Sequence, residues 1–211
     1  MSPITYHIPD HLIDAYAAGA LPHAFAVVVA AHLSMCDDCR ARAGAAEMLG
    51  GALMDRLEPA ALSAGARARM LAALDAPRPR QTSARRSGIF PAPVMEALHG
   101  QPPKWRMLGG GIRQQILSAD AQGSLRLLYI PPGRAVPEHG HRGLELTLVL
   151  QGGFSDGAGH FDVGDVEYAH EEVDHQPTAD LDGPCVVLAA TDAPLRFHAM
   201  IPRILQPIFR I

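Results

Sequence analysis

Two histidines and a glutamate, framed by two glycines, form the pattern in this chain that most directly suggests chemistry: Gly133-x5-His139-x-His141-x3-Glu145-x6-Gly152. The surrounding residues alternate as in a strand, where side chains two positions apart point to the same face. His139 and His141 therefore point the same way, and Glu145 joins them if the strand continues or bends gently. Imidazole and carboxylate groups that converge in this way are typical ligands of a metal ion.

A fourth ligand for this site is expected from the later stretch Gly164–His175. His175 is the natural choice, on a neighbouring strand, and His170 is a weaker competitor. Three histidines and one glutamate suit zinc, manganese, iron or nickel, and ligand chemistry alone does not select among them. The sequence therefore predicts a metal site at His139, His141, Glu145 and His175.

A second cluster of a different kind, His32-x3-Cys36-x2-Cys39, lies near the other end of the chain. On a helix these spacings place the three side chains on one face, and with a turn after Ser34 they still converge where two helices meet. Thiolate and imidazole are preferred zinc ligands, and structural zinc is usually held by four of them. A redox function of the cysteine pair would normally follow a strand, and none is predicted here. The cluster predicts a structural zinc site that still lacks one ligand.

The missing ligand is expected from one of three histidines nearer the N-terminus. His7 is favoured because it lies on a segment that can fold back, His11 is next, and His23 is third. A zinc ion held in this way would supply part of the stability of the helical region. The third cysteine, Cys185, is expected to be a buried, small apolar residue.

Composition and charge exclude several classes of protein. The 211 residues are 48% hydrophobic and 19% charged, with a net charge of −4, which is typical of a globular protein and not of one that coats nucleic acid. The most apolar run, Ala24 to Leu33, is too short to span a bilayer, and no basic region followed by an apolar stretch indicates a signal peptide. The C-x2-C pair favours metal chemistry in a reducing compartment. We expect a cytoplasmic protein that binds neither membrane nor nucleic acid directly.

Residues 1–75 are predicted to be helical because they are rich in Ala, Leu and Met and contain few β-branched residues. Asp10 and Ser63 are expected helix caps, and Gly19 is expected to end the first helix. After Trp105 the pattern changes to short stretches separated by Gly and Pro turns, which indicates strands. Helices are predicted at 11–18, 21–34, 37–57 and 64–74, and strands at 112–117, 125–130, 144–151, 166–169, 186–190 and 195–199.

These elements divide the chain into two predicted domains and a linker. Residues 1–78 are predicted to form an all-α small helical bundle with structural zinc. Residues 79–103 are predicted to be a linker, because their prolines and arginines favour an extended, poorly packing segment. Residues 104–211 are predicted to form an all-β domain, and their many short, evenly spaced strands indicate a jelly-roll β-barrel.

The stretch Gly133–Gly152 resembles the first sequence motif of the cupin family and matches it at every defining position. The second cupin motif is matched in part, since Gly164 and His175 have the required spacing. Three positions of that motif carry other residues: His170, Glu172 and Ala179. The resemblance implies the cupin fold and its set of metal ligands, and it carries over no particular cupin chemistry.

His7 followed by His32-x3-Cys36-x2-Cys39 resembles the zinc-binding anti-sigma domain, and with a C-terminal cupin the whole chain resembles the ChrR-type anti-sigma factors. The resemblance implies a helical domain that binds a sigma factor of the extracytoplasmic-function (ECF, group IV) class one-to-one and so represses transcription. It also implies that the cupin domain is needed for release of the sigma factor in response to singlet oxygen or organic peroxide. It implies two Zn²⁺ ions, one held by His7, His32, Cys36 and Cys39 and the other by His139, His141, Glu145 and His175.

Three apolar stretches are candidate contacts to a sigma factor: Leu12–Tyr16, Val27–Val29 and Met48–Leu57. The same residues are equally suited to the core of a helical bundle. If the cysteines were oxidised as the stress signal, loss of zinc would loosen this domain. On the resemblance, we expect the cupin domain rather than Cys36 and Cys39 to receive the signal.

The main alternative is a metal-dependent cupin enzyme, such as a dioxygenase or isomerase, with a helical accessory domain. Its metal would act as a Lewis acid or activate oxygen. No general base stands out beside the ligands, since Glu138, Glu172 and Asp174 are unremarkable in sequence. We therefore expect a regulator and not an enzyme.

Overall fold

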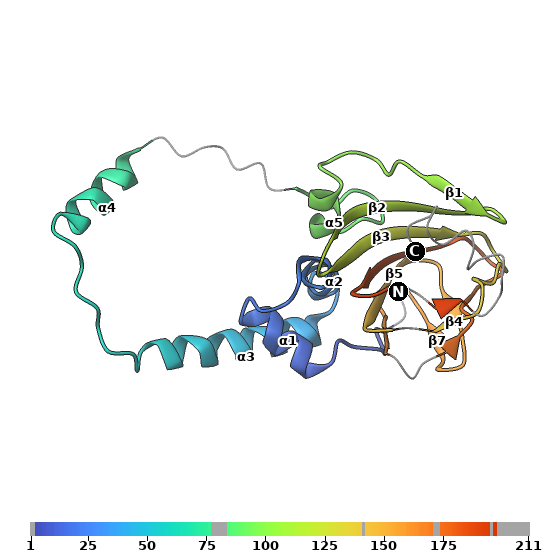
Figure 1. The fold of residues 1–211 in the computed structure, drawn as a ribbon, viewed down its shortest axis with the longest axis horizontal. Coiled ribbons are helices and arrows are strands. Elements are labelled where there is room, and N and C mark those ends of the chain that lie inside the picture. The colour runs from blue at the N-terminus through green and yellow to red at the C-terminus, as the bar shows by residue number, and fades with distance from the viewer. Residues whose placement is uncertain (1–2, 77–83, 141, 171–173, 195, 198–211) are drawn as a thin grey trace.

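The structure, a computed structural model, describes residues 3–76, 84–140, 142–170, 174–194 and 196–197. Helices form the first part of the chain and strands the second (Figure 1). The helices are α1 (Asp10–Ala17), α2 (His23–Leu33), α3 (Asp37–Met54), α4 (Ala66–Asp75) and α5 (Ala92–Ala97). The strands are β1 (Arg106–Gly109), β2 (Ile112–Asp120), β3 (Gly123–Ile130), β4 (His139–Gly140), β5 (Glu145–Gln151), β6 (Phe154–Ser155), β7 (His160–Phe161), β8 (Val166–Ala169), β9 (Asp174–His175), β10 (Thr178–Ala179), β11 (Cys185–Thr191) and β12 (Arg196–Phe197).

The four helices predicted in the first 75 residues are confirmed, with small shifts at their ends. Asp10 is not the cap of α1: Pro9 takes that position, and Asp10 lies in the first turn, where its charge interacts favourably with the helix dipole. Gly19 follows the end of α1 with φ of 68°, the left-handed conformation that glycine adopts easily. None of the helices in the described part of the chain is long and apolar enough to cross a membrane.

The strands form one large and two small sheets. The large sheet has six strands in the order β1-β2-β3-β11-β5-β8, and all its pairs are antiparallel. The small sheets have three strands each, in the orders β10-β6-β7 and β12-β4-β9. The side chains of Phe154, Phe161 and Ala179 from the first small sheet pack against Val149 and Val187 of the large sheet, so the two layers share a core.

The predicted jelly-roll barrel is correct as a β domain of two facing layers, but the large sheet of the described residues is not closed. Its edges are β1 and β8, which do not pair with each other. The second layer consists of two-residue strands, interrupted by glycine turns such as Gly152 (φ 67°) and Gly164 (φ 99°). Strands this short form local ladders and do not continue the large sheet into a barrel.

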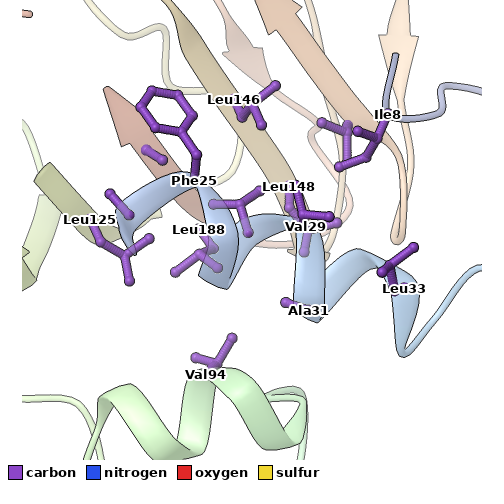
Figure 2. Packing of buried hydrophobic residues seen from close by; sticks show 14 of the residues in the cluster. Ile8, Phe25, Val29, Ala31, Leu33, Val94, Leu125, Leu146, Leu148 and Leu188 are labelled. Atoms are coloured by element: carbon purple, nitrogen blue, oxygen red, sulfur yellow. The ribbon is translucent and has the colours of Figure 1, made fainter. Parts of the chain in front are cut away.

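The two faces of the large sheet have different partners. Alternate residues of β3, β5 and β11 point outward, and Leu125, Leu146, Leu148 and Leu188 among them pack against α2 (Figure 2). Phe25 and Val29 of α2 lie in this contact and are at most 2% exposed. The other face points into the β domain and carries a group of buried polar side chains: Gln114, Arg126, Glu145, Thr147, Glu167 and Thr191. Strand alternation therefore gives one sheet an apolar face for the helices and a polar face toward the interior.

Part of the predicted linker, residues 79–103, is ordered against the rest of the protein. Residues 92–97 form α5, which packs on α2 on the side away from the sheet, with Val94 fully buried (Figure 2). Helix α2 is thus covered on two sides, by the large sheet and by α5. Helices α1, α2, α3 and α5 and the large sheet all contribute to one apolar core. The predicted domain limits at residues 78 and 104 stay a prediction.

We predict that Phe25→Ala lowers the free energy of unfolding of the full chain by about 3–5 kcal/mol, because it leaves a cavity between α2 and the sheet. The loss should appear in the helical and in the β signal together, since both layers line the cavity. Urea unfolding followed by circular dichroism measures it. Leu57→Ala is the control, because Leu57 is 70% exposed, and it should change stability by less than about 0.5 kcal/mol. Equal effects of the two variants would contradict this account of the core.

Candidate metal centres

The first candidate centre combines donor groups from three elements. His7 lies on the N-terminal segment before α1, His32 in the last turn of α2, and Cys36 and Cys39 at the start of α3. One donor atom from each of these four residues lies within 4.8 Å of all the others. Nδ1 of His7 is 3.3 Å from Sγ of Cys36 and 3.6 Å from Sγ of Cys39. The structure therefore brings together all four residues predicted for the N-terminal site.

These distances fit a tetrahedral zinc ion. With bonds of about 2.3 Å to sulfur and about 2.0 Å to nitrogen, the N–S edges of such a tetrahedron are about 3.5 Å long. The orientation of His32 also fits a zinc ligand. Its Nδ1 donates a hydrogen bond to the carbonyl of Gly164 (2.9 Å). That bond directs Nε2 toward the site, where it is buried and has no hydrogen-bond partner among the described residues. A nitrogen lone pair held in this way, next to two sulfurs and a second imidazole, is what a zinc site requires.

Both sulfurs accept hydrogen bonds from nearby donors. Cys36 is the N-cap residue of α3, and its Sγ accepts a hydrogen bond from the backbone N–H of Cys39 at the positive end of the helix. Arg42 donates to Sγ of Cys39 at 2.7 Å. Burial and the neighbouring Cys36 nevertheless raise the pKa of the Cys39 thiol overall, against the backbone hydrogen bond from Ile8 and the charge of Arg42. Burial also lowers the pKa of His32 to about 4, so this imidazole is neutral, as a metal ligand must be.

The two alternative histidines for this site lie elsewhere. The ring of His11 packs edge-on against Tyr168 of β8, with 5.9 Å between the ring centroids. His23 is an exposed residue at the start of α2, at the end of that helix away from His32. Neither belongs to the group of donors around Cys36 and Cys39.

The second candidate centre lies inside the β domain. His139 of β4 and His175 of β9 are direct partners in one small sheet, and their Nε2 atoms are 3.2 Å apart. Nδ1 of His139 donates to the carbonyl of Pro137 (2.8 Å), which turns Nε2 toward His175. Two imidazole nitrogens at this separation fit adjacent ligands of one metal ion, for which bonds of about 2.0 Å predict a spacing of about 3 Å.

Glu145 and His141 complete the predicted set for this centre. Glu145 begins β5 on the inner face of the large sheet, is 8% exposed, and accepts a hydrogen bond from Oγ1 of Thr147 (2.9 Å). Its charge acts on His175, where it contributes to a raised pKa. His141 lies outside the described residues. The structure thus brings His139 and His175 into contact, with Glu145 close enough to act on His175 electrostatically.

Two carboxylates that the sequence did not indicate hold His175 in place. Nδ1 of His175 lies 2.8 Å from Oδ2 of Asp156 and 2.8 Å from Oε1 of Glu167. Burial lowers the pKa of His175, but the hydrogen bonds to Glu167 and Asp156 and the charges of Glu167 and Glu145 outweigh this and raise it to about 9, so a metal ion there would have to displace a proton. Burial raises the pKa of Glu167 to about 7. A carboxylate on the far nitrogen of a histidine orients a metal ligand and increases its basicity.

Arg126 places a positive charge in the same interior. This residue of β3 is 6% exposed, and its guanidinium donates to Oγ of Ser124 (2.7 Å) and Oε1 of Gln114 (3.4 Å). Burial lowers the pKa of Arg126, and the negative charge of Glu145 opposes that effect. The interior therefore contains a charge opposite to that of the predicted ligand Glu145.

The geometry defines a class of protein: a helical region with a His₂Cys₂ centre, packed on a β domain with a second histidine centre. Residues 95–193 match the family described as the ChrR cupin-like domain. The anti-sigma-E factor ChrR of Cereibacter sphaeroides is 51% identical to this chain over 211 residues, covering 99% of both. A crystal structure of Rhodobacter sphaeroides SigE in complex with the anti-sigma ChrR includes a chain that is 49% identical, with a TM-score of 0.80, covering 90% of this chain and 99% of that one. The chain belongs to the ChrR family of anti-sigma factors.

Cys185 is separate from both centres, and its predicted burial is confirmed. It is 0% exposed, and burial raises the pKa of its thiol to about 12.

We predict that Cys185 of the native protein resists iodoacetamide at pH 8, since on the order of 1 in 10,000 thiols is then ionised. Cys36 and Cys39 should react once a chelator has removed metal. Mass spectrometry of alkylated peptides measures this, with the urea-unfolded chain as control, in which all three cysteines should react. Rapid native modification of Cys185 would contradict the assignment.

Proposed function

We propose that this protein is an anti-sigma factor that binds an ECF-type sigma factor one-to-one through its N-terminal helices and thereby represses transcription. The observation that carries the proposal is an exposed apolar surface on α3, α4 and the segment between them. Nine of the twelve large apolar side chains that are exposed among the described residues lie between residues 48 and 74. They are Met48, Leu49, Leu53, Met54, Leu57, Leu62, Met70, Leu71 and Leu74. A concentration of this kind is typical of a protein–protein interface.

Helix α4 supports the proposal because it buries no side chain against the other described elements. It has ten residues, none of them buried, and it lies away from the helices and sheets of the main body (Figure 1). An isolated helix of that length is marginal in water. A partner that covers Met70, Leu71 and Leu74 would supply the missing apolar contacts.

The three apolar stretches considered as contacts now have different roles. Leu12 and Ile13 of α1 and Val28 and Val29 of α2 are at most 5% exposed and belong to the core, so they are not available to a partner. Met48–Leu57 remains exposed along the second half of α3. The relative with a solved complex has SigE as its partner, and this region is where we expect this chain to bind the corresponding sigma factor.

Zinc is the metal we assign to the first centre, with His7, His32, Cys36 and Cys39 as its ligands. The ion would join the N-terminal segment, the end of α2 and the start of α3. The His₂Cys₂ donor set and the near-tetrahedral spacing support this assignment. We assign a second zinc to His139, His141, Glu145 and His175. We also propose that the helical domain ends at residue 78 and the cupin domain begins at residue 104, so that each domain has one centre.

A regulatory role of the cupin domain is favoured over catalysis. We propose that it is needed for release of the sigma factor in response to singlet oxygen or organic peroxide. Of the three acidic residues considered as general bases, Glu138 and Asp174 are exposed and Glu172 lies outside the described residues. Membership of a family of anti-sigma factors supports regulation, and neither finding supports a dioxygenase or isomerase.

We predict that Leu53→Glu weakens binding of the SigE homologue from the same organism at least about tenfold, a loss of about 1.4 kcal/mol or more. A charge at an apolar contact would have to be desolvated in the complex. Isothermal titration calorimetry with the full chain measures the affinity. Leu181→Glu is the matched control, because Leu181 is 87% exposed but lies in the β domain, and it should bind normally. Wild-type protein that forms no complex would refute the proposed function, and equal affinities of the two variants would refute the proposed surface.

We predict that His139→Ala retains binding of the sigma factor but loses its release under singlet oxygen. The substitution removes a ligand of the second centre and leaves the surface of α3 and α4 unchanged. Complex formation is measured by co-purification before and after illumination with a photosensitiser. His160→Ala, which changes an exposed histidine of the same domain, is the control and should respond normally. Normal release from the His139 variant would overturn the assigned role of the cupin domain.

A further inference from the structure

The N-terminal segment Ile4–Ile8 contacts the β domain directly before it reaches the first metal centre. The carboxylate of Asp165 accepts hydrogen bonds at Oδ1 from the backbone N–H groups of Thr5 (2.7 Å) and Tyr6 (2.9 Å). The backbone N–H of Val166, the first residue of β8, donates to the carbonyl of Tyr6 (3.0 Å). Three hydrogen bonds thus hold the two residues that immediately precede His7.

Asp165 is itself held rigidly within the β domain. It is 2% exposed, and its Oδ2 accepts a hydrogen bond from the N–H of Asp162 (2.8 Å). Its carbonyl accepts from the N–H of Val149 in β5 (3.1 Å). Hydrogen bonds to an ionised acceptor are stronger than those between neutral groups. Asp165 is therefore a rigidly held hydrogen-bond acceptor for the N-terminal segment.

The neighbouring residue, Gly164, contacts the other imidazole of the centre. Its carbonyl accepts the Nδ1 hydrogen bond of His32 described above, and this bond is buried. The N–H of Gly164 donates to Val149 (2.9 Å), so β5 holds this carbonyl in place as well. The same two-residue turn of the β domain thus orients one histidine directly and holds the segment that carries the other.

The N-terminal segment Ile4–Ile8 is closely packed against the β domain. Gly164 has φ of 99°, and a Cβ added there would lie 2.6 Å from Cδ1 of Ile4. The ring of Tyr6 packs on Phe161 of β7 with 4.4 Å between centroids. Ile8, on the other side of His7, is fully buried in the shared core. His7 therefore lies between two segments that are fixed by contacts to the rest of the protein.

We propose that Gly164 and Asp165 of the β domain are positioning residues of the N-terminal metal centre, which is therefore built from both halves of the protein. The proposal rests on the metal assigned to that centre under the proposed function. Asp165 acts through the backbone of residues 5 and 6, which places His7, and Gly164 acts through Nδ1 of His32. Outer groups of this kind typically change metal affinity by about 10–100-fold.

The arrangement links the two candidate centres along one strand. Two residues beyond Asp165, Glu167 of β8 accepts a hydrogen bond from His175. Linkage is reciprocal, so a metal bound at the first centre stabilises the turn at residues 164–165, and a displacement of that turn lowers metal affinity by the same factor. If a change at His175 displaced β8, the turn at residues 164–165 would move with it and the hold on His7 and His32 would weaken.

We test the proposal with Asp165→Ala in the full-length chain, titrated with Co²⁺ in the absence of any sigma factor. The thiolate-to-cobalt charge-transfer absorption reports only the centre that contains Cys36 and Cys39, because Cys185 belongs to the separate apolar cluster. We expect Asp165→Ala to lower Co²⁺ affinity at least about tenfold. Asp162→Ala is the matched control, since this carboxylate lies in the same loop and pairs with His160, and it should bind as wild type does. Wild-type affinity in the Asp165 variant would overturn the proposal.

A second pair of variants decides the matter if Asp165→Ala does not fold. Thr5→Pro removes the N–H that donates to Asp165 and leaves the β domain intact, whereas Thr5→Ala keeps that N–H and serves as its control. We expect Thr5→Pro alone to lower Co²⁺ affinity and to speed amide exchange at residues 162–166. Unchanged affinity and exchange would overturn the proposal. Because no sigma factor is present, this result is independent of whether the chain proves to bind one.

Discussion

The packing of α2 against the large sheet determines where the functional parts of this protein lie. Phe25, Val28 and Val29 are at most 2% exposed and fill the space between the helix and the outer leucines of the sheet. The last turn of α2 is thereby placed beside β8, so that His32 reaches the carbonyl of Gly164. Helix α3 starts only a few residues later and takes its position from the same contact. Without this packing, neither the His₂Cys₂ centre nor the direction of α3 would be defined.

The same sheet serves two chemically different purposes because strand residues alternate between faces. Leu146 and Leu148 of β5 point outward to α2, while Glu145 and Thr147 point into the β domain. A shift of β5 by one residue would place leucines at the second candidate centre and turn Glu145 and Thr147 toward α2. The helical region and the interior centre therefore depend on one register, and selection on either of them constrains the other.

Local spacing made much of the candidate sites predictable. His32, Cys36 and Cys39 converge because a short turn joins the end of α2 to the start of α3 within eight residues of chain. His7 joins them from an N-terminal segment that folds back. Five of the six strands of the large sheet could be predicted from short apolar runs between Gly and Pro turns, and β1 was missed. Asp156 and Glu167 could not, because an acidic residue between Val166 and Tyr168 has the pattern of an exposed position, and only the tertiary fold buries it. The packing of α2 on the sheet and of α5 on α2 could not be predicted either. An apolar helix face shows that a helix is buried, but it does not specify which element covers it.

Helix α3 connects the first metal centre to the exposed apolar surface. Its first turn contains Cys39, with Cys36 as its N-cap, and its 18 residues span about 27 Å toward the segment that carries Leu53 and Leu57. Gly44, Gly50 and Gly51 lie within it with room for a Cβ, and each costs up to about 1 kcal/mol of helix stability relative to alanine. Only Cys39 and Ala43 of this helix are buried, so packing compensates little of that cost. Under the proposed function, the order of α3 would come from its two ends, the cysteines held by a metal ion at the start and a bound partner along the second half. Loss of either contact weakens the other through the helix between them.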